Sequence, residues 1–359
     1  MKILVISLAG IGDTLLATPL LHVLREHYPQ ATMDVLVMWA GAKQILEGNP
    51  HVNTVYHEDL IRKGALASVR DLLPYRKHRY DLSINTYPQS KFQYRVITRI
   101  LGAKRRISHR HGLHSAFDFL LVSQTVAEDY EVHCIDNNLN LLQPLGIPLP
   151  PQPLDCEIFF TEAEKEWAES FAREQALGEK LVLGLHVGSG KTKNLILKRW
   201  PLEHYVTLLK RLLAAHPKLT VLLFGGPEEK EDNEFILRQM KGERVLQVPS
   251  RSIKQAAAAL EKCNLFLSVD NAFMHLAATM KVPQQIVIES PTFNKTIHPY
   301  HRPFRLVQNP MVAGRNLEYY RYDGRDIQGT SEHLLACMRS ITPEAVFQVV
   351  SDAMKDVRQ

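Results

Sequence analysis

Short apolar runs rich in β-branched residues alternate with segments of helical periodicity from the first residue onward. This alternation is typical of parallel sheets built from βαβ units, so the sequence predicts an α/β fold. In the first half, strands are expected at 2–7, 34–39, 53–57 and 80–85, with a first helix over 14–28. In the second half, strands are expected at 181–186, 220–224, 244–248, 264–269 and 285–288.

A proline-rich segment at 144–153 separates the two series of strands. It contains five prolines and one glycine, a density that neither a helix nor a central strand tolerates. We therefore expect an N-terminal Rossmann-like domain over 1–150 and a C-terminal one over 151–330, with a ligand cleft between them. Segment 331–359 should form two helices, broken at Thr342-Pro343, that return to the N-terminal domain.

The bulk composition narrows the class of protein. The chain of 359 residues is 45% hydrophobic and 23% charged, which is typical of globular domains, and it has no run of about 20 apolar residues. Four cysteines are scattered without a C-x-x-C pair, so buried thiols are expected rather than a zinc knuckle or disulfide framework. These features predict a cytoplasmic protein.

Positive charge is concentrated between residues 62 and 110. This window holds thirteen Lys and Arg residues against two Asp, and it predicts an anionic partner. Acidic sugar, phosphate and membrane surface all fit that sign, as does a solvated face balanced by acids elsewhere. Nucleic acid is not expected, because no recognised reading module or stacking array of aromatics is present.

Two glycine-rich stretches resemble nucleotide-binding motifs without meeting their requirements. Gly10 and Gly12 follow the first strand, but the third glycine position of a dinucleotide fingerprint holds Leu15. The stretch Gly188-Ser-Gly-Lys-Thr192 resembles a P-loop, but the first glycine position holds Leu185. An NAD enzyme and an NTPase are therefore both disfavoured.

Polar residues follow several of the expected strands, where open α/β sheets bind ligands. Asp13 follows the first strand; it can act as a base there, or simply cap the next helix. Lys198 precedes a helix and suits a diphosphate, and the carboxylates of Glu228 and Glu229 suit ribose hydroxyls or helix capping. Asp270 opens a further strand-to-helix turn.

In this order the motifs resemble the ADP-heptose:lipopolysaccharide heptosyltransferases, family 9 of the glycosyltransferases, over nearly the whole chain. The motifs that carry the resemblance are Gly12-Asp13 with Thr18-Pro19, His186-Val-Gly-Ser189, Lys198-Arg-Trp-Pro201, Gly225-Gly-Pro-Glu228, Asp270 with His275-Leu-Ala277, and Ile341-Thr-Pro-Glu344.

The resemblance implies a GT-B fold and an inverting transfer of heptose, without metal or cofactor, from ADP-heptose to an acidic lipopolysaccharide inner-core acceptor. Asp13 matches the catalytic base. Residues matched to donor binding are Lys198, Glu228, Glu229, Asp270, Asn271, His275, Gly188 and Ser189. Residues expected at the acceptor, which can lie at the inner face of the cytoplasmic membrane, are Gly12, Thr14, Lys104, Arg105 and Arg106.

Two departures from the family pattern concern the donor side. Ala272 replaces the usual glycine two residues after the donor-site aspartate, and Ser290-Pro-Thr-Phe293 replaces Gly-Pro-Thr-Asp. The donor sugar is therefore less constrained than the reaction type. Alternatives are a different nucleotide sugar, a protein acceptor, or a sugar-nucleotide binding protein without turnover.

Overall fold

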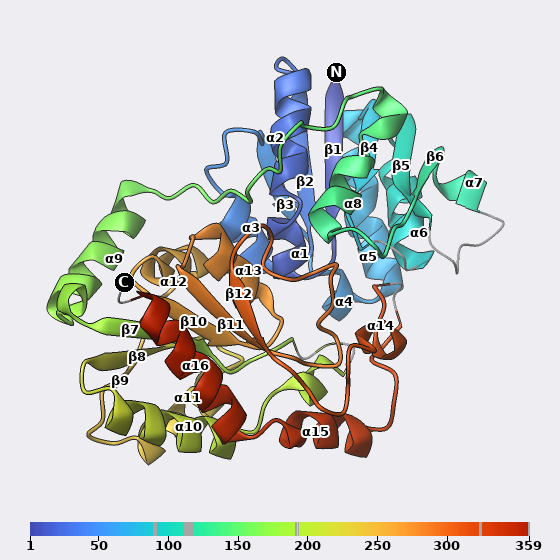
Figure 1. Cartoon of the computed structure of the whole chain (residues 1–359). Coiled ribbons are helices and arrows are strands. Elements are labelled where there is room, and N and C mark those ends of the chain that lie inside the picture. The colour runs from blue at the N-terminus through green and yellow to red at the C-terminus, as the bar shows by residue number, and fades with distance from the viewer. Residues whose placement is uncertain (89–91, 111–117, 191, 193, 323–324, 358–359) are drawn as a thin grey trace. The chain divides into compact units, whose positions relative to one another are not determined.

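A computed structural model describes residues 1–88, 92–110, 118–190, 192, 194–322 and 325–357. The chain divides into two compact units (Figure 1). The first comprises Met1–Phe159 with Tyr322–Gly324, and the second comprises Phe160–Arg321 with Arg325–Gln359. The chain first passes from one unit to the other between Phe159 and Phe160, after the proline-rich segment 144–153.

The first unit is built on a six-stranded sheet in which all neighbouring strands are parallel, coloured blue to cyan in Figure 1. Its order is β3-β2-β1-β4-β5-β6. The strands are β1 (Lys2–Ser7), β2 (Thr32–Val37), β3 (Thr54–His57), β4 (Leu82–Asn85), β5 (Arg105–Arg110) and β6 (Gln124–Ala127). The central strands are buried on both faces, which explains why β1, β2 and β4 read as nearly continuous apolar runs.

Short helices connect these strands. They are α1 (Ile11–Leu15), α2 (Thr18–His27), α3 (Ala40–Leu46), α4 (Leu60–Lys63), α5 (Ala65–Leu72), α6 (Phe92–Leu101), α7 (Asp118–Leu121) and α8 (Cys134–Asn140), with 3-10 turns η1 (Leu73–His78) and η2 (Gln143–Leu145).

The single helix predicted over 14–28 is two helices, α1 and α2. Pro19 stands in the first turn of α2, and a proline there has no N–H to continue the ladder from α1. The Thr18 hydroxyl donates instead to the Leu15 carbonyl at 2.8 Å. The prediction missed this break because the apolar periodicity continues across it.

Three strands were missed from the sequence: β5, β6 and, in the second unit, β12 (Phe304–Val307). Charged residues occupy both ends of β5, and β6 is a four-residue edge strand with alternate residues exposed. Neither presents the apolar run by which the other strands were found. β5 is held in the sheet by pairing with β4, and β6 by pairing with β5, although their own residues do not favour a strand.

The second unit repeats the design with a parallel six-stranded sheet of order β12-β11-β10-β7-β8-β9. Its other strands are β7 (Leu181–His186), β8 (Leu219–Phe224), β9 (Val245–Gln247), β10 (Leu265–Ser268) and β11 (Gln284–Ile288). Its helices are α9 (Glu162–Glu174), α10 (Leu202–Ala215), α11 (Lys230–Gln239), α12 (Ile253–Leu260), α13 (Ala272–Thr279), α14 (Asn316–Tyr319), α15 (Ser331–Ser340) and α16 (Pro343–Val357), with 3-10 turns η3 (Leu177–Glu179) and η4 (Leu195–Lys198).

The two C-terminal helices form as predicted, but they belong to the second unit rather than the first. In Figure 1 they are the red ribbons labelled α15 and α16. α16 packs on α10, β11 and β12, and its buried residues Val346, Val350 and Met354 join the core of that sheet. Apolar periodicity predicted the helices without indicating which sheet their apolar faces cover.

Two bulk expectations can be compared with the structure. Cys134, Cys263 and Cys337 are buried free thiols, as expected, whereas Cys156 is partly exposed. Among the described residues, no helix combines the length and apolar character needed to cross a membrane.

Candidate active site

The strand order of each sheet indicates where a ligand binds. Counted within its own unit, each sheet has the order 3-2-1-4-5-6, so the winding reverses between β1 and β4 and again between β7 and β10. Ligands of open α/β sheets bind outside the carboxyl ends of the strands at this reversal. Asp13 follows β1, Gly188 follows β7 and Asp270 follows β10. Predicted site residues therefore lie at the reversal point of each sheet.

Asp13 is the third residue of α1, and Gly10 occupies the N-cap position. The Gly10 N–H donates to Asp13 Oδ2 at 2.6 Å, and a Cβ at Gly10 would lie 2.9 Å from that oxygen. Asp13 therefore closes the helix start from its third position, and the interpretation of Asp13 as the N-cap itself is wrong. The bond fixes the direction of the carboxylate at the end of β1.

Thr14, expected at the acceptor, is buried at 1% exposure. Its hydroxyl lies 2.9 Å from the Ser7 hydroxyl and 3.3 Å from the Gly10 carbonyl. Thr14 thus holds the turn that presents Asp13. Gly12, the other acceptor residue expected in this turn, is half-buried inside α1.

Two further side chains of the first unit lie close enough to Asp13 to sense its charge. Burial and the Asp13 carboxylate raise the pKa of Tyr94, on α6, to about 12. Burial, with a smaller effect of Asp13, raises the pKa of the Cys134 thiol at the start of α8. Both groups are therefore protonated at neutral pH. Tyr94 is not among the site residues expected from the sequence, because nothing local connects α6 to the turn after β1.

The basic residues Lys104, Arg105 and Arg106 are not brought together with Asp13. Arg105 pairs with Leu82, and Leu82 pairs with Ile3, so the three cations lie at the amino edge of the parallel sheet. Asp13 lies beyond the carboxyl edge. Spacing along the chain could not indicate the edge, because that depends on strand register.

Each of these three cations also has a protein partner. Lys104 Nζ donates to Asp81 Oδ1 at 2.8 Å. Arg105 Nη2 donates to Gln124 Oε1 at 2.8 Å, and Arg106 donates to backbone carbonyls of 103 and 121. The structure therefore places these three expected acceptor residues at the sheet edge opposite to Asp13. Arg110, at the carboxyl end of β5 and exposed, is a member of the basic window that lies on the same edge as Asp13.

In the second unit Lys198 and Asp270 form a buried ion pair. Their exposed fractions are 6% and 2%, and Lys198 Nζ lies 2.8 Å from Asp270 Oδ2. Lys198 also donates to the Asp270 carbonyl at 2.6 Å and to Thr292 Oγ1 at 3.2 Å. An ammonium group has three N–H donors. All three are used within the protein, so a phosphate contact requires one of these partners to be exchanged.

Asp270 is held from the loop after β11 as well. The Ser290 hydroxyl donates to Asp270 Oδ1, and the Thr292 hydroxyl donates to Asp270 Oδ2 at 2.6 Å. Ser290 and Phe293 are the two residues of stretch 290–293 that depart from the family pattern. Ser290 adds a bond to the aspartate, and Phe293 packs with Met274 and Val287 in a small apolar cluster.

The structure separates the two candidate ribose carboxylates. Glu229 is buried at 6% exposure, and its Oε2 accepts from the Gly226 N–H at 3.0 Å. Burial acts to raise the pKa of Glu229, but His186, that N–H and Arg199 outweigh it and lower the pKa. Glu228 is exposed, so it is the carboxylate that a ligand can reach.

Gly188 is required by the position of Glu229. A Cβ at Gly188 would lie 2.2 Å from Glu229 Oε1. The neighbouring Ser189 is buried, and its hydroxyl donates to the Leu195 carbonyl at 2.9 Å. Arg199 donates to the Ser189 carbonyl at 2.7 Å and to Asp232 at 2.7 Å. The sequence motif contained Arg199, but only the fold reveals that it holds the loop after β7.

Asn271 caps the start of α13, and His275 lies within that helix. Asn271 Oδ1 accepts from the N–H groups of Phe273 and Met274, and its amide donates to His186 Nδ1 at 3.1 Å and to the Gly188 carbonyl at 3.0 Å. Asn271 therefore caps the helix and ties it to the loop after β7. Burial lowers the pKa of His275 to about 4, so its imidazole is neutral at pH 7 and offers hydrogen bonds rather than positive charge.

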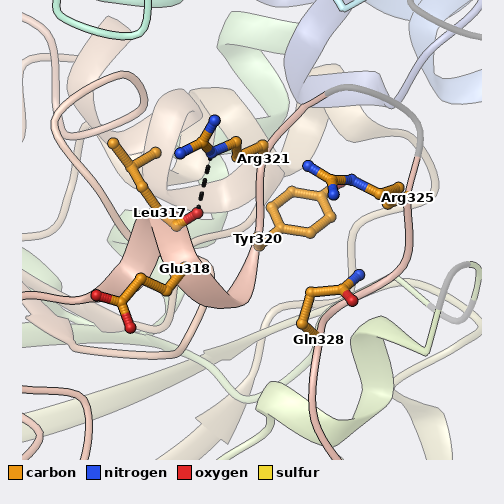
Figure 2. Close-up of a pocket in the computed structure, with 6 residues that line it drawn as sticks. All are labelled: Leu317, Glu318, Tyr320, Arg321, Arg325 and Gln328. Carbon is orange, nitrogen blue, oxygen red and sulfur yellow. Dashed lines mark hydrogen bonds between the residues drawn. The ribbon is translucent and has the colours of Figure 1, made fainter. Parts of the chain in front are cut away.

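A hollow of about 290 Å³ lies beside α14, lined by Leu317, Glu318, Tyr320, Arg321, Arg325 and Gln328. Figure 2 shows both arginine side chains beside Tyr320, with Arg321 Nε donating to the Leu317 carbonyl at 3.2 Å. None of the predicted site residues lines it. On its buried side, however, α14 is joined to the Asp270 network, because Asn316 Nδ2 donates to the Ser290 carbonyl at 2.9 Å.

The model of glycosyltransferase family 9 (heptosyltransferase) matches residues 74–319. Lipopolysaccharide heptosyltransferase 3 of Escherichia coli strain K12 is 26% identical over 299 residues, which are 82% of this chain and 82% of the relative. A family 9 glycosyltransferase from Veillonella parvula superposes with a TM-score of 0.75 at 20% identity, covering 99% of this chain and 97% of that one. E. coli heptosyltransferase WaaC, solved with ADP-2-deoxy-2-fluoro heptose, gives a TM-score of 0.68 at 18% identity over 98% of this chain and 99% of that one.

These likenesses agree with the geometry. Two doubly wound parallel sheets, each with ligand-type residues at its reversal point, make up a GT-B fold shared with the solved heptosyltransferases. The family model covers more than half of the chain and spans the Lys198 and Asp270 network. This chain therefore belongs to glycosyltransferase family 9, and it is a glycosyltransferase.

Proposed function

We propose that this enzyme transfers heptose from ADP-heptose to an acidic inner-core acceptor of lipopolysaccharide, with inversion at the anomeric carbon. The proposal is carried by the different residues that lie where the strand order reverses in each of the two sheets. One presents the Asp13 carboxylate, and the other presents Lys198 and the capped start of α13. The relatives named lipopolysaccharide heptosyltransferases and the solved ADP-heptose analogue complex support this choice of donor and acceptor.

Asp13 is proposed as the general base. Its carboxylate takes the proton from the acceptor hydroxyl while the oxygen forms a bond to the anomeric carbon. The bond from that carbon to the diphosphate oxygen breaks, and ADP leaves with the electron pair. The Gly10 N–H holds the carboxylate in one direction, which favours proton transfer by orientation.

The donor is proposed to bind at the carboxyl edge of the second sheet. The exposed Glu228 is suited to ribose hydroxyls, while the buried Glu229 shapes the glycine loop at Gly188. Lys198, Asp270 and neutral His275 are proposed to line the diphosphate and sugar positions. Cationic and N–H groups at this edge stabilise the charge on departing ADP, so no metal is proposed in the transfer step.

The acceptor is proposed to reach Asp13 from an anionic membrane surface contacted by α4, α5 and η1. Ile61, Leu66 and Leu73 on these elements are 56%, 89% and 47% exposed. The side chains of Arg62 and Arg70 between them are 89% and 79% exposed. Apolar side chains interleaved with arginine suit an anionic lipid interface. Because α4 begins near the end of β3, this surface starts at the same sheet edge as Asp13.

Vesicle binding tests this surface. Phosphatidylglycerol vesicles should retain the wild-type protein, and phosphatidylcholine vesicles should retain far less. Leu66→Asp should abolish retention, while Leu149→Asp, at a 47% exposed leucine of the interdomain segment, should not. Equal loss in both variants, or equal binding to both lipids, contradicts a membrane role for α5.

The activity itself is tested with purified protein, ADP-heptose and lipopolysaccharide cores truncated before their heptoses. ADP release and a product heavier by one heptose are expected at 25 °C, and EDTA should leave the rate unchanged. ADP-glucose serves as the donor control. Absence of ADP release with every inner-core acceptor, despite measurable ADP-heptose binding, would favour a binding protein without turnover.

A further inference from the structure

A cluster of two histidines and a glutamate lies outside the site described above, where the interdomain segment leaves the first unit. His22 is on α2, His51 follows α3, and Glu157 belongs to the segment after η2. His22 Nδ1 lies 2.9 Å from Glu157 Oε1, and His51 Nε2 lies 3.0 Å from Glu157 Oε2. One carboxylate thus faces two imidazoles that are far apart in sequence.

The atoms that face one another are the kind that bind a metal ion. One nitrogen from each histidine and an oxygen of Glu157 lie within 4.8 Å of one another. Zinc bonds to imidazole nitrogen and carboxylate oxygen at about 2.0–2.2 Å, so neighbouring ligands of one ion lie roughly 3.3 Å apart. Each histidine nitrogen already lies 2.9 or 3.0 Å from a Glu157 oxygen, which is near that spacing.

Each ligand is also held from behind. His22 Nε2, the nitrogen that faces away from Glu157, lies 3.2 Å from Glu26 Oε1. A carboxylate on the second nitrogen is the usual support for a metal-bound histidine. Arg25 donates twice to the His51 carbonyl, at 2.9 and 3.2 Å, and the Glu157 N–H donates to the Thr18 hydroxyl at 3.0 Å.

The surroundings suit a bound divalent cation. The side chains of His22, His51 and Glu157 are 28%, 15% and 26% exposed, so an ion can enter and keep a water in a fourth position. Two carboxylates, Glu157 and Glu26, face the imidazoles, and they balance a 2+ charge. The Arg25 guanidinium is turned toward backbone carbonyls.

We propose that His22, His51 and Glu157 bind one divalent transition-metal ion of the zinc type. The ion fixes the interdomain segment to α2 and to the loop after α3. It is a structural site: His22 lies on α2, beyond the turn that presents Asp13, and the ion takes no part in sugar transfer. The site does not depend on the identity of the donor or acceptor.

Metal titration of the full-length, tag-free protein after chelator treatment and dialysis tests the proposal. Zinc should bind at one equivalent per chain in competition with a chromophoric chelator, and Co²⁺ should give the visible absorption of a low-symmetry site. Zinc at 100 times its dissociation constant should raise Tm by about 5 °C or more. EDTA should reverse this shift without changing the transfer rate at 25 °C.

Four variants complete the design. His51→Gln and Glu157→Gln should abolish stoichiometric zinc binding, and Glu26→Gln should weaken it about 10–100-fold. His27→Gln changes an exposed histidine of the same helix and should bind zinc as the wild type does. If a ligand variant is poorly folded, Glu26→Gln and the Co²⁺ spectrum still decide the matter. The proposal is wrong if the wild type binds zinc no more tightly than His51→Gln does, or if His27→Gln loses zinc affinity to the same extent. The cluster is then a set of hydrogen bonds without a metal ion.

Discussion

Replacing Lys198 by alanine should destabilise the second unit as well as impair catalysis. The substitution removes the partner of Asp270, whose exposed fraction is 2%. Removing one member of a buried ion pair costs about 3–5 kcal/mol, because the remaining charge stays buried. Asp270 keeps bonds from Ser290 and Thr292, which places the expected loss near 3 kcal/mol.

Calorimetry can measure this loss. For a domain of this size about 1 kcal/mol corresponds to 2–4 °C, so the transition of the second unit should fall by about 6–12 °C in Lys198→Ala. The double variant Lys198→Met/Asp270→Asn removes both charges and should recover much of the loss, with a coupling of about 2 kcal/mol or more. A fall below about 2 °C in Lys198→Ala, or additive effects in the double variant, would refute the buried pair.

The same variants separate the structural role of Lys198 from its chemical one. We expect the double variant to recover thermal stability but not turnover, because the charge on departing ADP still lacks its cation. Recovery of turnover together with stability would mean that Lys198 acts only by holding Asp270.

Three other changes test separate parts of the account. Gly188→Ala should cost roughly 1–3 kcal/mol and raise the KM for ADP-heptose, since the new Cβ would displace Glu229; an unchanged Tm would contradict that packing. Because the folded-state pKa of His275, about 4, lies below the 6.5 of an unperturbed histidine, its contribution to stability is complete above pH 6.5 and is lost between pH 6.5 and 4. The free energy of unfolding should fall by at most about 3 kcal/mol over this range in the wild type, and this fall should be absent in His275→Gln. Calorimetric pH profiles that are identical for the two proteins would contradict the prediction. Arg110→Glu should raise the KM for the acceptor, most at low salt, while glutamates at 104–106 should leave it unchanged. A higher KM in the 104–106 variant than in Arg110→Glu would contradict acceptor binding at the carboxyl edge of the first sheet.

The α/β fold could be predicted because most strands here are buried on both faces. A strand such as β1 or β7 must then be almost wholly apolar, and such a run is visible in sequence. β5 could not be found in this way, since only its middle residues are buried. The prediction that α15 and α16 return to the N-terminal domain was wrong, because an apolar helix face does not specify which sheet it covers.

Some residues of the candidate site could also be predicted from the sequence. Asp13, Gly188 and Asp270 each follow a strand, and strand ends of parallel sheets collect at one edge. The hydrogen bonds that hold these residues in place could not be predicted from the sequence. Ser290 lies 20 residues from Asp270, and their bond exists because β10 and β11 are neighbours in the sheet.

The most direct test of the central claim is the turnover of Asp13→Asn. Asparagine keeps a side-chain oxygen for the Gly10 N–H, so the start of α1 and the binding of ADP should remain close to wild type. Asparagine cannot take the acceptor proton, and loss of a general base typically lowers the rate about 10²–10⁴-fold. We predict that ADP release from ADP-heptose with an inner-core acceptor falls by at least about 100-fold, with Tm nearly unchanged. Turnover within a few-fold of wild type would contradict the assignment of Asp13 as the catalytic base.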